Sequence, residues 1–232
     1  MERILLARRG GGFGRTRGVS LVELLAVLAI LLLIFAMAGV LIGPPLKKAR
    51  LAGAANSVAN LATRVPIESQ RQAGGQGAAV FLKATTADRN FELVADTVDA
   101  DPAAPNGPDG MFQDPTGSPA DAVIASEALV HLPDGIVFYD MGAPYDACWT
   151  RWGDAGGGNY VLGADLRGRT VNQNGVQIAG PASLNLTHAD MIGPNPTVTP
   201  LTVYRLTFNA LWGVRLTRLV QDPAAPTGWR EF

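Results

Sequence analysis

The feature that most constrains this chain is a run of 23 residues, Leu24 to Leu46, without a single charged side chain. As a helix at about 1.5 Å per residue, the run would extend roughly 35 Å. About 20 apolar residues suffice to cross the hydrocarbon core of a bilayer. The core helix of a soluble protein does not need an apolar run of this length. We therefore expect one membrane-spanning helix over residues 19–46.

The charges around this run predict how the chain crosses the membrane. Cytoplasmic flanks of membrane helices are rich in Lys and Arg, so an arginine-rich N-terminus is expected in the cytoplasm. Lys47, Lys48 and Arg50 on the other side oppose this orientation weakly. The rest of the chain is then expected on the periplasmic or exterior face. The arginines before the run are Arg3, Arg8, Arg9, Arg15 and Arg17.

The overall composition excludes several classes of protein. The chain has 19 Lys+Arg against 20 Asp+Glu, which argues against a generally basic nucleic-acid binder. One Cys excludes an intramolecular disulfide, and two His make a histidine-rich metal site unfavourable. The net charge of −1 is an average over unlike segments. Residues 88–154 are strongly acidic, with thirteen acidic and two basic side chains.

Glu23 is the unusual residue at the start of the apolar run. A carboxylate inside hydrocarbon costs a few kcal/mol unless it is paired or neutralised, so it is a functional candidate. The alternative is that Glu23 lies at the headgroup boundary and is simply solvated. Its position alone does not separate these two interpretations.

The residues around Glu23 favour the functional interpretation. The stretch Gly18-Val19-Ser20-Leu21-Val22-Glu23, with its arginine-rich leader and apolar continuation, resembles the class III signal of type IV pilins and type II secretion pseudopilins. The resemblance implies a leader over residues 1–18 that a prepilin peptidase removes after Gly18. Val19 would become the methylated N-terminus, and Glu23 the fifth mature residue. The first mature residue in this family is usually Phe, and Val19 departs from that.

The resemblance also implies a non-enzymatic function with defined partners. The chain would be a minor pilin or pseudopilin, anchored by a single pass in the bacterial inner membrane and then assembled into a type II secretion pseudopilus or a type IV pilus. Glu23 would neutralise the N-terminal amine of a neighbouring subunit, since a buried charge is tolerable when a partner of opposite sign is supplied. The implied partners are other pilin-like subunits, the prepilin peptidase and the inner-membrane assembly platform.

A second processing site remains open. Ala36-Met37-Ala38 resembles the A-x-A cleavage site of a secretory signal peptide. Cleavage there would release a soluble periplasmic protein that begins at Gly39. The charge of Glu23 and the apolar continuation through Ile42 fit this alternative less well.

An amphipathic stem helix is expected over residues 47–76. Leu51, Ala55, Val58, Leu61 or Ala62, and Val65 follow the spacing of one helix face. Pro44-Pro45 should break or bend the helix before this stem, and Pro66 should interrupt it, because proline lacks the N–H and clashes with the preceding turn. The glycine-rich stretch over residues 72–77 should end the stem near residue 72.

Residues 77–232 are expected to form a periplasmic, β-rich head. The fold class is therefore α+β, a long hydrophobic helical stem packed on an antiparallel sheet or sandwich. Residues 132–138 and 205–216 resemble, loosely, the head of the H-type minor pseudopilin and related minor pilins. Residues 99–121 look like an insertion, and 121–132 are expected to be helical. Strands are expected at 78–84, 91–98, 136–142, 160–166, 176–178, 183–187, 203–209 and 214–220.

The acidic insertion holds weak candidates for a calcium site. Asp99, Asp101 and Asp109 supply carboxylate oxygens in a Gly- and Pro-rich loop, and calcium takes six to eight oxygens. Their spacing does not match an EF-hand, and a solvated acidic loop is the alternative. No other cofactor is expected.

Other candidate residues in the head have ordinary structural interpretations. Cys148 is expected to be a small buried residue, and the aromatic cluster is expected to pack in the core, with a sugar or partner site as the alternative. No nucleophile motif accompanies His131 and His188. Four arginines near the C-terminus leave a DNA-binding minor pilin as a further alternative, although nucleic-acid binding needs denser basic clustering. The aromatic cluster is Tyr145, Trp149 and Trp152, and the arginines are Arg205, Arg215, Arg218 and Arg230.

Overall fold

The computed structural model describes residues 19–72, 79–97, 108–117, 120–124, 129–141, 145 and 147–232, without the side chains of 38–41 and 72. The chain divides into two compact units, residues 1–43 and residues 44–232, and each is described by itself. The helix α1 (Leu21–Gln72) contributes to both.

In the first unit, α1 begins where Ser20 caps it. The Glu23 N–H donates to Ser20 Oγ at 3.2 Å, and the Leu24 N–H donates to the Ser20 carbonyl at 3.1 Å. A serine followed three residues later by glutamate is the capping-box pattern, which satisfies backbone donors at a helix start. The apolar side chains that follow are exposed around the whole helix. Among the described residues, one helix is long and apolar enough to cross a membrane, with a mean hydropathy of 3.1 over its most apolar window.

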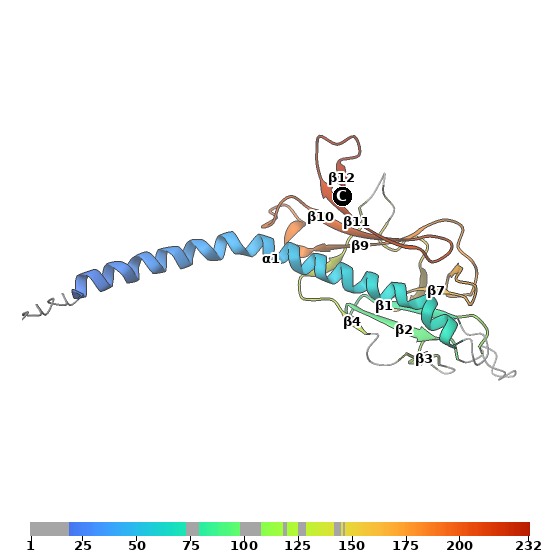
Figure 1. Ribbon diagram of the computed structural model, residues 1–232. Coiled ribbons are helices and arrows are strands. Elements are labelled where there is room, and N and C mark those ends of the chain that lie inside the picture. The colour runs from blue at the N-terminus through green and yellow to red at the C-terminus, as the bar shows by residue number, and fades with distance from the viewer. Residues whose placement is uncertain are drawn as a thin grey trace, which may run out of the picture. The chain divides into compact units, whose positions relative to one another are not determined.

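In the second unit, the stem segment of α1 buries one face against the head. The face expected from the sequence is confirmed, since Leu51, Ala55, Val58, Leu61 and Val65 are all buried. Asn56 and Asn60 on the opposite face are exposed. Figure 1 shows this segment running between the strands of two sheets, and its buried side chains share one core with both.

The expected break of the helix at Pro44-Pro45 and its expected interruption at Pro66 are wrong, while a bend at Pro44-Pro45 stays a prediction. Pro44, Pro45 and Pro66 all lie inside α1. Pro66 has no N–H to donate to the carbonyl of Ala62, four residues earlier. A proline inside a helix normally costs about 3 kcal/mol or more, because this hydrogen bond is lost and the ring clashes with the preceding turn. Here the indole N–H of Trp212 donates to that carbonyl at 2.7 Å in a buried contact. The freed acceptor is therefore satisfied from another element.

In the described part of the head, one sheet contains seven strands, all paired antiparallel. Its central order is β3-β2-β1-β7-β6, with β4 also on β2 and β8 also on β7. Its strands are β1 (Val80–Thr85), β2 (Asn90–Ala95), β3 (Ala122–Val123), β4 (Val130–His131), β6 (Gly153–Gly156), β7 (Asn159–Ala164) and β8 (Thr170–Val171).

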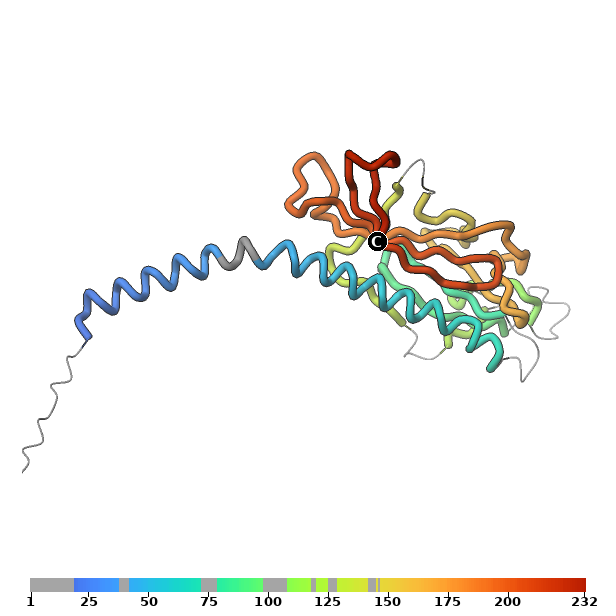
Figure 2. The backbone as a smooth tube through the Cα atoms, turned by 45° about the horizontal axis from the view of Figure 1, so that its top comes forward, coloured from blue at the N-terminus to red at the C-terminus, as the bar shows by residue number. Residues whose placement is uncertain are grey.

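The second sheet contains five antiparallel strands in the order β12-β11-β10-β9-β5. Figure 2 shows the red-orange hairpin of β10 and β11 extending alongside the cyan stem of the helix. The expected C-terminal hairpin and its turn at 210–213 are confirmed. The strands are β5 (Ile136–Phe138), β9 (Ala182–His188), β10 (Thr202–Phe208), β11 (Val214–Gln221) and β12 (Trp229–Glu231), and a 3-10 turn η2 (Ala189–Met191) follows β9.

The first sheet carries a smaller second core on its other face. Because successive side chains of a strand point to opposite faces, Val80, Leu82 and Ala84 belong to the main core while Phe81 belongs to the small one. Gly163 on β7 makes room for Phe81, whose ring lies 2.4 Å from where a Cβ at 163 would stand. The loop over residues 108–117, the acidic loop, contributes Phe112. Its ring packs edge-on to Phe81 with 5.7 Å between ring centroids. The loop over 108–117 thus covers this face.

The α+β fold class expected from the sequence is confirmed, but two of its elements are wrong. Residues 121–132 were expected to be helical, whereas Ala122–Val123 and Val130–His131 are short strands that pair with β2. Residues 176–178 make only an isolated bridge, between Gln177 and Val171. The strand expected at 136–142 ends at Phe138.

Candidate functional sites

The first candidate site is the apolar surface of α1 in the first unit. Its large side chains are exposed on every side of the helix, and Phe35 retains 70% of its surface. A helix that is apolar all round is found buried in a protein core or in a membrane. The segment therefore requires a non-aqueous environment, which the described residues of its own unit do not supply. The exposed side chains are Leu21, Val22, Leu24, Leu25, Val27, Leu28, Ile30, Leu31, Leu32, Leu33, Ile34, Phe35 and Met37.

The residues of the expected processing motif lie at the start of this helix. Val19 is exposed, and Glu23 occupies the third helical position, where its backbone N–H is held by Ser20. Negative charge in the first turn is favoured by the helix dipole. Glu23 thus has a local structural role in addition to the expected role in assembly. Gly18 and the expected leader over 1–18 lie outside the described residues.

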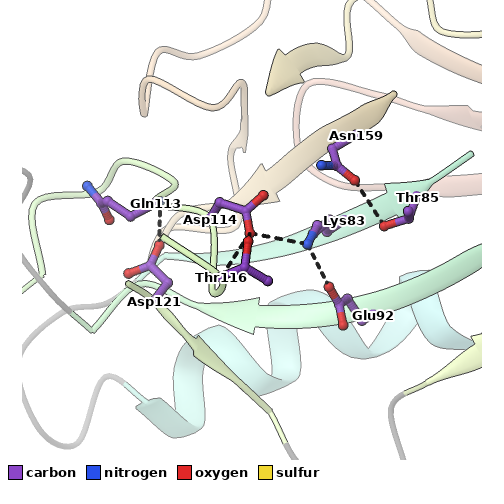
Figure 3. Close-up of polar contacts among 8 residues, drawn as sticks. All are labelled: Lys83, Thr85, Glu92, Gln113, Asp114, Thr116, Asp121 and Asn159. Carbon is purple, nitrogen blue, oxygen red and sulfur yellow. Dashed lines mark hydrogen bonds and ion pairs between the residues drawn. The ribbon is translucent and has the colours of Figure 1, made fainter. Parts of the chain in front are cut away.

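The second candidate site is the acidic loop over the outer face of the first sheet (Figure 3). Its carboxylates mainly accept hydrogen bonds from backbone N–H groups. Asp121 accepts the N–H groups of Thr97 and Gln113 at 3.0 and 2.7 Å, which ties the loop to the end of β2. Asp109 accepts the Met111 N–H at 2.7 Å. Of the expected calcium candidates, Asp99 and Asp101 lie outside the described residues.

Lys83 supplies the positive charge at this site. Only 7% of its side chain is exposed, on the face of β1 that the loop covers. Its ammonium nitrogen lies 3.0 Å from Glu92 Oε1 on the paired strand and 3.6 Å from Asp114 Oδ1 on the loop. Burial opposes ionisation of Asp114, but hydrogen bonds from Thr116 and the charge of Lys83 outweigh it and lower the pKa of Asp114. The Lys83 ammonium therefore balances the charge of two carboxylates of this site, neither of which is one of the calcium candidates.

Asp96, at the end of β2, is the most perturbed carboxyl group of the site. It is fully buried, and its Oδ2 accepts the Gly110 N–H at 2.6 Å. Its Oδ1 has no hydrogen-bond partner in the described part of the chain. Burial, together with the neighbouring charges of Asp121 and Asp109, raises the pKa of Asp96 to about 7. Within the described ranges, no group of three or more His, Cys, Asp or Glu side chains is placed to hold a metal ion.

The aromatic residues that are adjacent in the sequence separate in the structure. Trp149 stacks on Tyr160 with ring centroids 4.3 Å apart and contacts Trp152, which in turn packs on Phe208. These rings belong to or border the main core, as expected. Tyr145 also borders the main core, where it packs against Trp229 near the C-terminus.

The remaining candidates do not form a reactive site. Cys148 is buried as expected, and burial raises the pKa of its thiol to about 12. Its Sγ–H donates to the Asn185 carbonyl at 3.2 Å. The two histidines lie in different sheets, His131 on β4 beside Asn90 and His188 at the end of β9. Burial and the charges of Lys47 and Arg50 lower the pKa of His188, against the opposing effect of Asp190.

The C-terminal arginines are not gathered into one basic patch. Arg205 lies over the ring of Tyr145, Arg218 lies over the ring of Phe232, and Arg230 pairs with Asp222 at 2.5 Å. Arg215 and Arg218 are three residues apart on β11, so they point to opposite faces of the sheet. This arrangement gives little support to the DNA-binding alternative.

Two residues of these sites were missed by sequence reasoning. Lys83 follows Phe81 and Leu82 and precedes Ala84, so its position in a strand of buried residues was a signal that its charge needs a partner. Trp212 was assigned only to a turn, and nothing local in the sequence connects it with Pro66, 146 positions earlier in the chain.

No protein-family model and no curated protein matches the chain. A solved structure, the minor pseudopilin EpsH from the type 2 secretion system of Vibrio cholerae, is similar at 12% identity and a TM-score of 0.38. The similarity covers 72% of this chain and 95% of that chain. At this level the likeness decides neither family nor function, which must be argued from the residues of this chain.

Proposed function

We propose that this chain is a minor pilin-like subunit. It is inserted in the inner membrane through the first half of α1, with its N-terminus in the cytoplasm and its head in the periplasm. A prepilin peptidase removes residues 1–18, methylates Val19, and the mature subunit enters a type II secretion pseudopilus or a type IV pilus. The head contacts other subunits or the material that the filament carries, and no catalytic step is assigned to it.

The observation that carries this proposal is the combination of Glu23 with the helix that follows it. Exposed apolar side chains surround α1 from Leu21 to Phe35, and the single carboxylate lies in the first turn. A membrane satisfies the apolar surface, and so does a bundle of identical helices. The carboxylate near the N-terminus additionally favours the bundle, because a neighbouring subunit's Val19 amine can neutralise it.

The local role of Glu23 in capping gives a sharp way to test its role in assembly. Glu23→Gln keeps a side chain that serves at the third position of a capping box, but it removes the negative charge. Glu23→Ala removes both. We expect both variants to insert in the membrane normally and both to be depleted at least tenfold from sheared filament fractions, measured by quantitative immunoblotting.

The matched control is Ser20→Ala, which removes the cap and keeps the charge. Loss of an N-cap costs about 1 kcal/mol of helix stability, and we expect assembly to continue. Normal assembly of Glu23→Gln together with failure of Ser20→Ala would show that the motif acts through capping and would contradict charge neutralisation.

A further inference from the structure

The proposed function leaves the buried amine of Lys83 without an assigned role. Lysine is almost never fully buried unless it is paired. The side chain lies between β1, β2 and the covering loop, with two carboxylates beside its nitrogen (Figure 3). Those carboxylates, Glu92 and Asp114, are themselves only 21% and 29% exposed. A nucleophile and two carboxyl groups are thus held together with limited access to water.

The two carboxylates are held in different ways. Glu92 is the cross-strand partner of Lys83 in the β1–β2 ladder, and its Oε1 is 3.0 Å from the amine nitrogen. Asp114 Oδ1 accepts both the backbone N–H of Thr116 at 2.9 Å and its hydroxyl at 2.8 Å. These two donors point at the oxygen on which negative charge would build if an amine attacked the Asp114 carboxyl carbon.

We propose that Lys83 and Asp114 become joined by an isopeptide bond, with Glu92 as the proton-transfer catalyst. The amine nitrogen lies 3.6 Å from Asp114 Oδ1, an oxygen of the carboxyl group whose carbon it would attack. Holding two groups side by side in this way favours an intramolecular reaction between them. Both strands are central to a rigid sheet, so the amine and Glu92 are preorganised. The proposal concerns the head alone and does not depend on the proposed function.

The reaction balances without any co-reactant. Glu92 accepts a proton from the Lys83 ammonium, and passes it to Oδ2 of Asp114. The neutral amine attacks the Asp114 carboxyl carbon, the N–C bond forms, and charge on Oδ1 is held by Thr116. The nitrogen loses a second proton through Glu92 to Oδ2, the C–Oδ2 bond breaks, and one water leaves. Glu92 ends as it began, and nothing is oxidised or reduced.

The ionised pair is the resting state, and it reacts slowly because an ionised carboxylate is a poor electrophile. A single turnover during the lifetime of the chain is sufficient. The product would tie the covering loop, with Phe112, permanently to β1, and it would close a ring from residue 83 to residue 114. The bond would therefore make this loop more resistant to unfolding.

Intact mass spectrometry of the full chain, purified in detergent, tests the bond directly. We expect the mass to fall short of the sequence mass by one water, and trypsin to leave the chain uncut after Lys83. Fragmentation should find the segment with Lys83 linked to the one with Asp114. A succinimide at Asp114 cannot mimic this loss, because residue 115 is proline and offers no backbone N–H. A full-length mass with a free Lys83 would overturn the proposal.

Four variants locate the chemistry. Lys83→Arg and Asp114→Ala should keep the full mass of their sequences. Asp114→Asn should lose ammonia in place of water and reach the same final mass as the cross-linked wild type. Glu92→Gln should remain uncross-linked through purification, since proton-transfer catalysis contributes about a hundredfold or more. Lys48→Arg, on an exposed lysine that donates to the Thr199 carbonyl, is the control and should cross-link fully. Complete cross-linking of Glu92→Gln would overturn the role of Glu92.

Discussion

At the residue scale, Asp96 and Asp114 show how the surroundings of a carboxyl group set its pKa. Asp96 and Asp114 lie beneath and within the same acidic loop, yet their pKa values move in opposite directions. Asp96 has lost water and faces other carboxylates, so its neutral form is favoured. Asp114 has also lost water, but the donors of Thr116 and the ammonium of Lys83 favour its charged form. Asp96, beneath the loop, therefore stabilises the fold more in its protonated form than in its ionised form.

The raised pKa of Asp96 predicts how stability depends on pH. The ordinary carboxyl ionises near pH 3.8 in the unfolded chain, whereas the folded one holds its proton to about pH 7. Stability from this group is fully present below about pH 4 and is lost as pH rises to about 7. Asp96→Asn should remove this dependence and raise the Tm above pH 7 by about 2–4 °C, or roughly 1 kcal/mol.

Thermal unfolding at pH 5 and pH 8 measures this effect. Asp88→Asn is the matched control, because Asp88 is exposed in the turn between β1 and β2 and should show no gain. A fall in Tm at pH 8 for Asp96→Asn would mean that the ionised carboxylate stabilises the fold, contrary to the expectation.

The arrangement around Lys83 also predicts the response to chelators. The Lys83 ammonium balances the negative charges of Glu92 and Asp114, so these carboxylates already have a positively charged partner in the chain itself. We expect a chelator to leave the Tm of the full chain unchanged within error. A drop of several degrees, restored by calcium, would show that the candidates Asp99, Asp101 and Asp109 hold a cation after all.

At the scale of elements, α1 depends on a hydrogen bond from outside itself. The Trp212 indole replaces the donor that Pro66 lacks, and the β10–β11 turn that carries Trp212 is fixed by Asn209, whose side chain accepts the N–H groups of Leu211 and Gly213. The stem helix and the C-terminal hairpin are therefore joined at one buried acceptor, the carbonyl of Ala62.

A double-mutant cycle tests this link. Trp212→Phe should cost about 1–3 kcal/mol, because it leaves a buried carbonyl without its donor. In a Pro66→Ala background the helix supplies its own N–H to Ala62, and we expect the cost of Trp212→Phe to fall by at least half. Chemical denaturation gives both values. Equal costs in the two backgrounds would mean that Trp212 contributes only by packing.

The sequence predicted elements whose patterns are local and missed those that depend on distant partners. The buried face of the stem followed from helical spacing, and β10 and β11 from alternation. The helix expected over 121–132 was wrong because a two-residue strand has no local sequence pattern. The strands Ala122–Val123 and Val130–His131 are formed by pairing with β2. Trp212 could not be foreseen as the partner of Ala62, and the charge compensation at Lys83 required knowing that the acidic loop folds over β1.

At the scale of the whole molecule, the two units require different surroundings. The second unit buries a core of its own between the stem and two sheets. The first unit leaves its apolar side chains exposed, so it is stable only where lipid or other helices cover it. This difference between the two units supports the proposal that the chain is held in a membrane and then transferred to a helical bundle.

The N-terminus of the mature chain tests this claim most directly. The full chain is expressed with a prepilin peptidase, recovered from the membrane fraction, and its N-terminal peptide is identified by mass spectrometry. We predict a chain that begins at an N-methylated Val19. A chain that begins at Gly39, or one that retains Met1 in the presence of active peptidase, would contradict the claim.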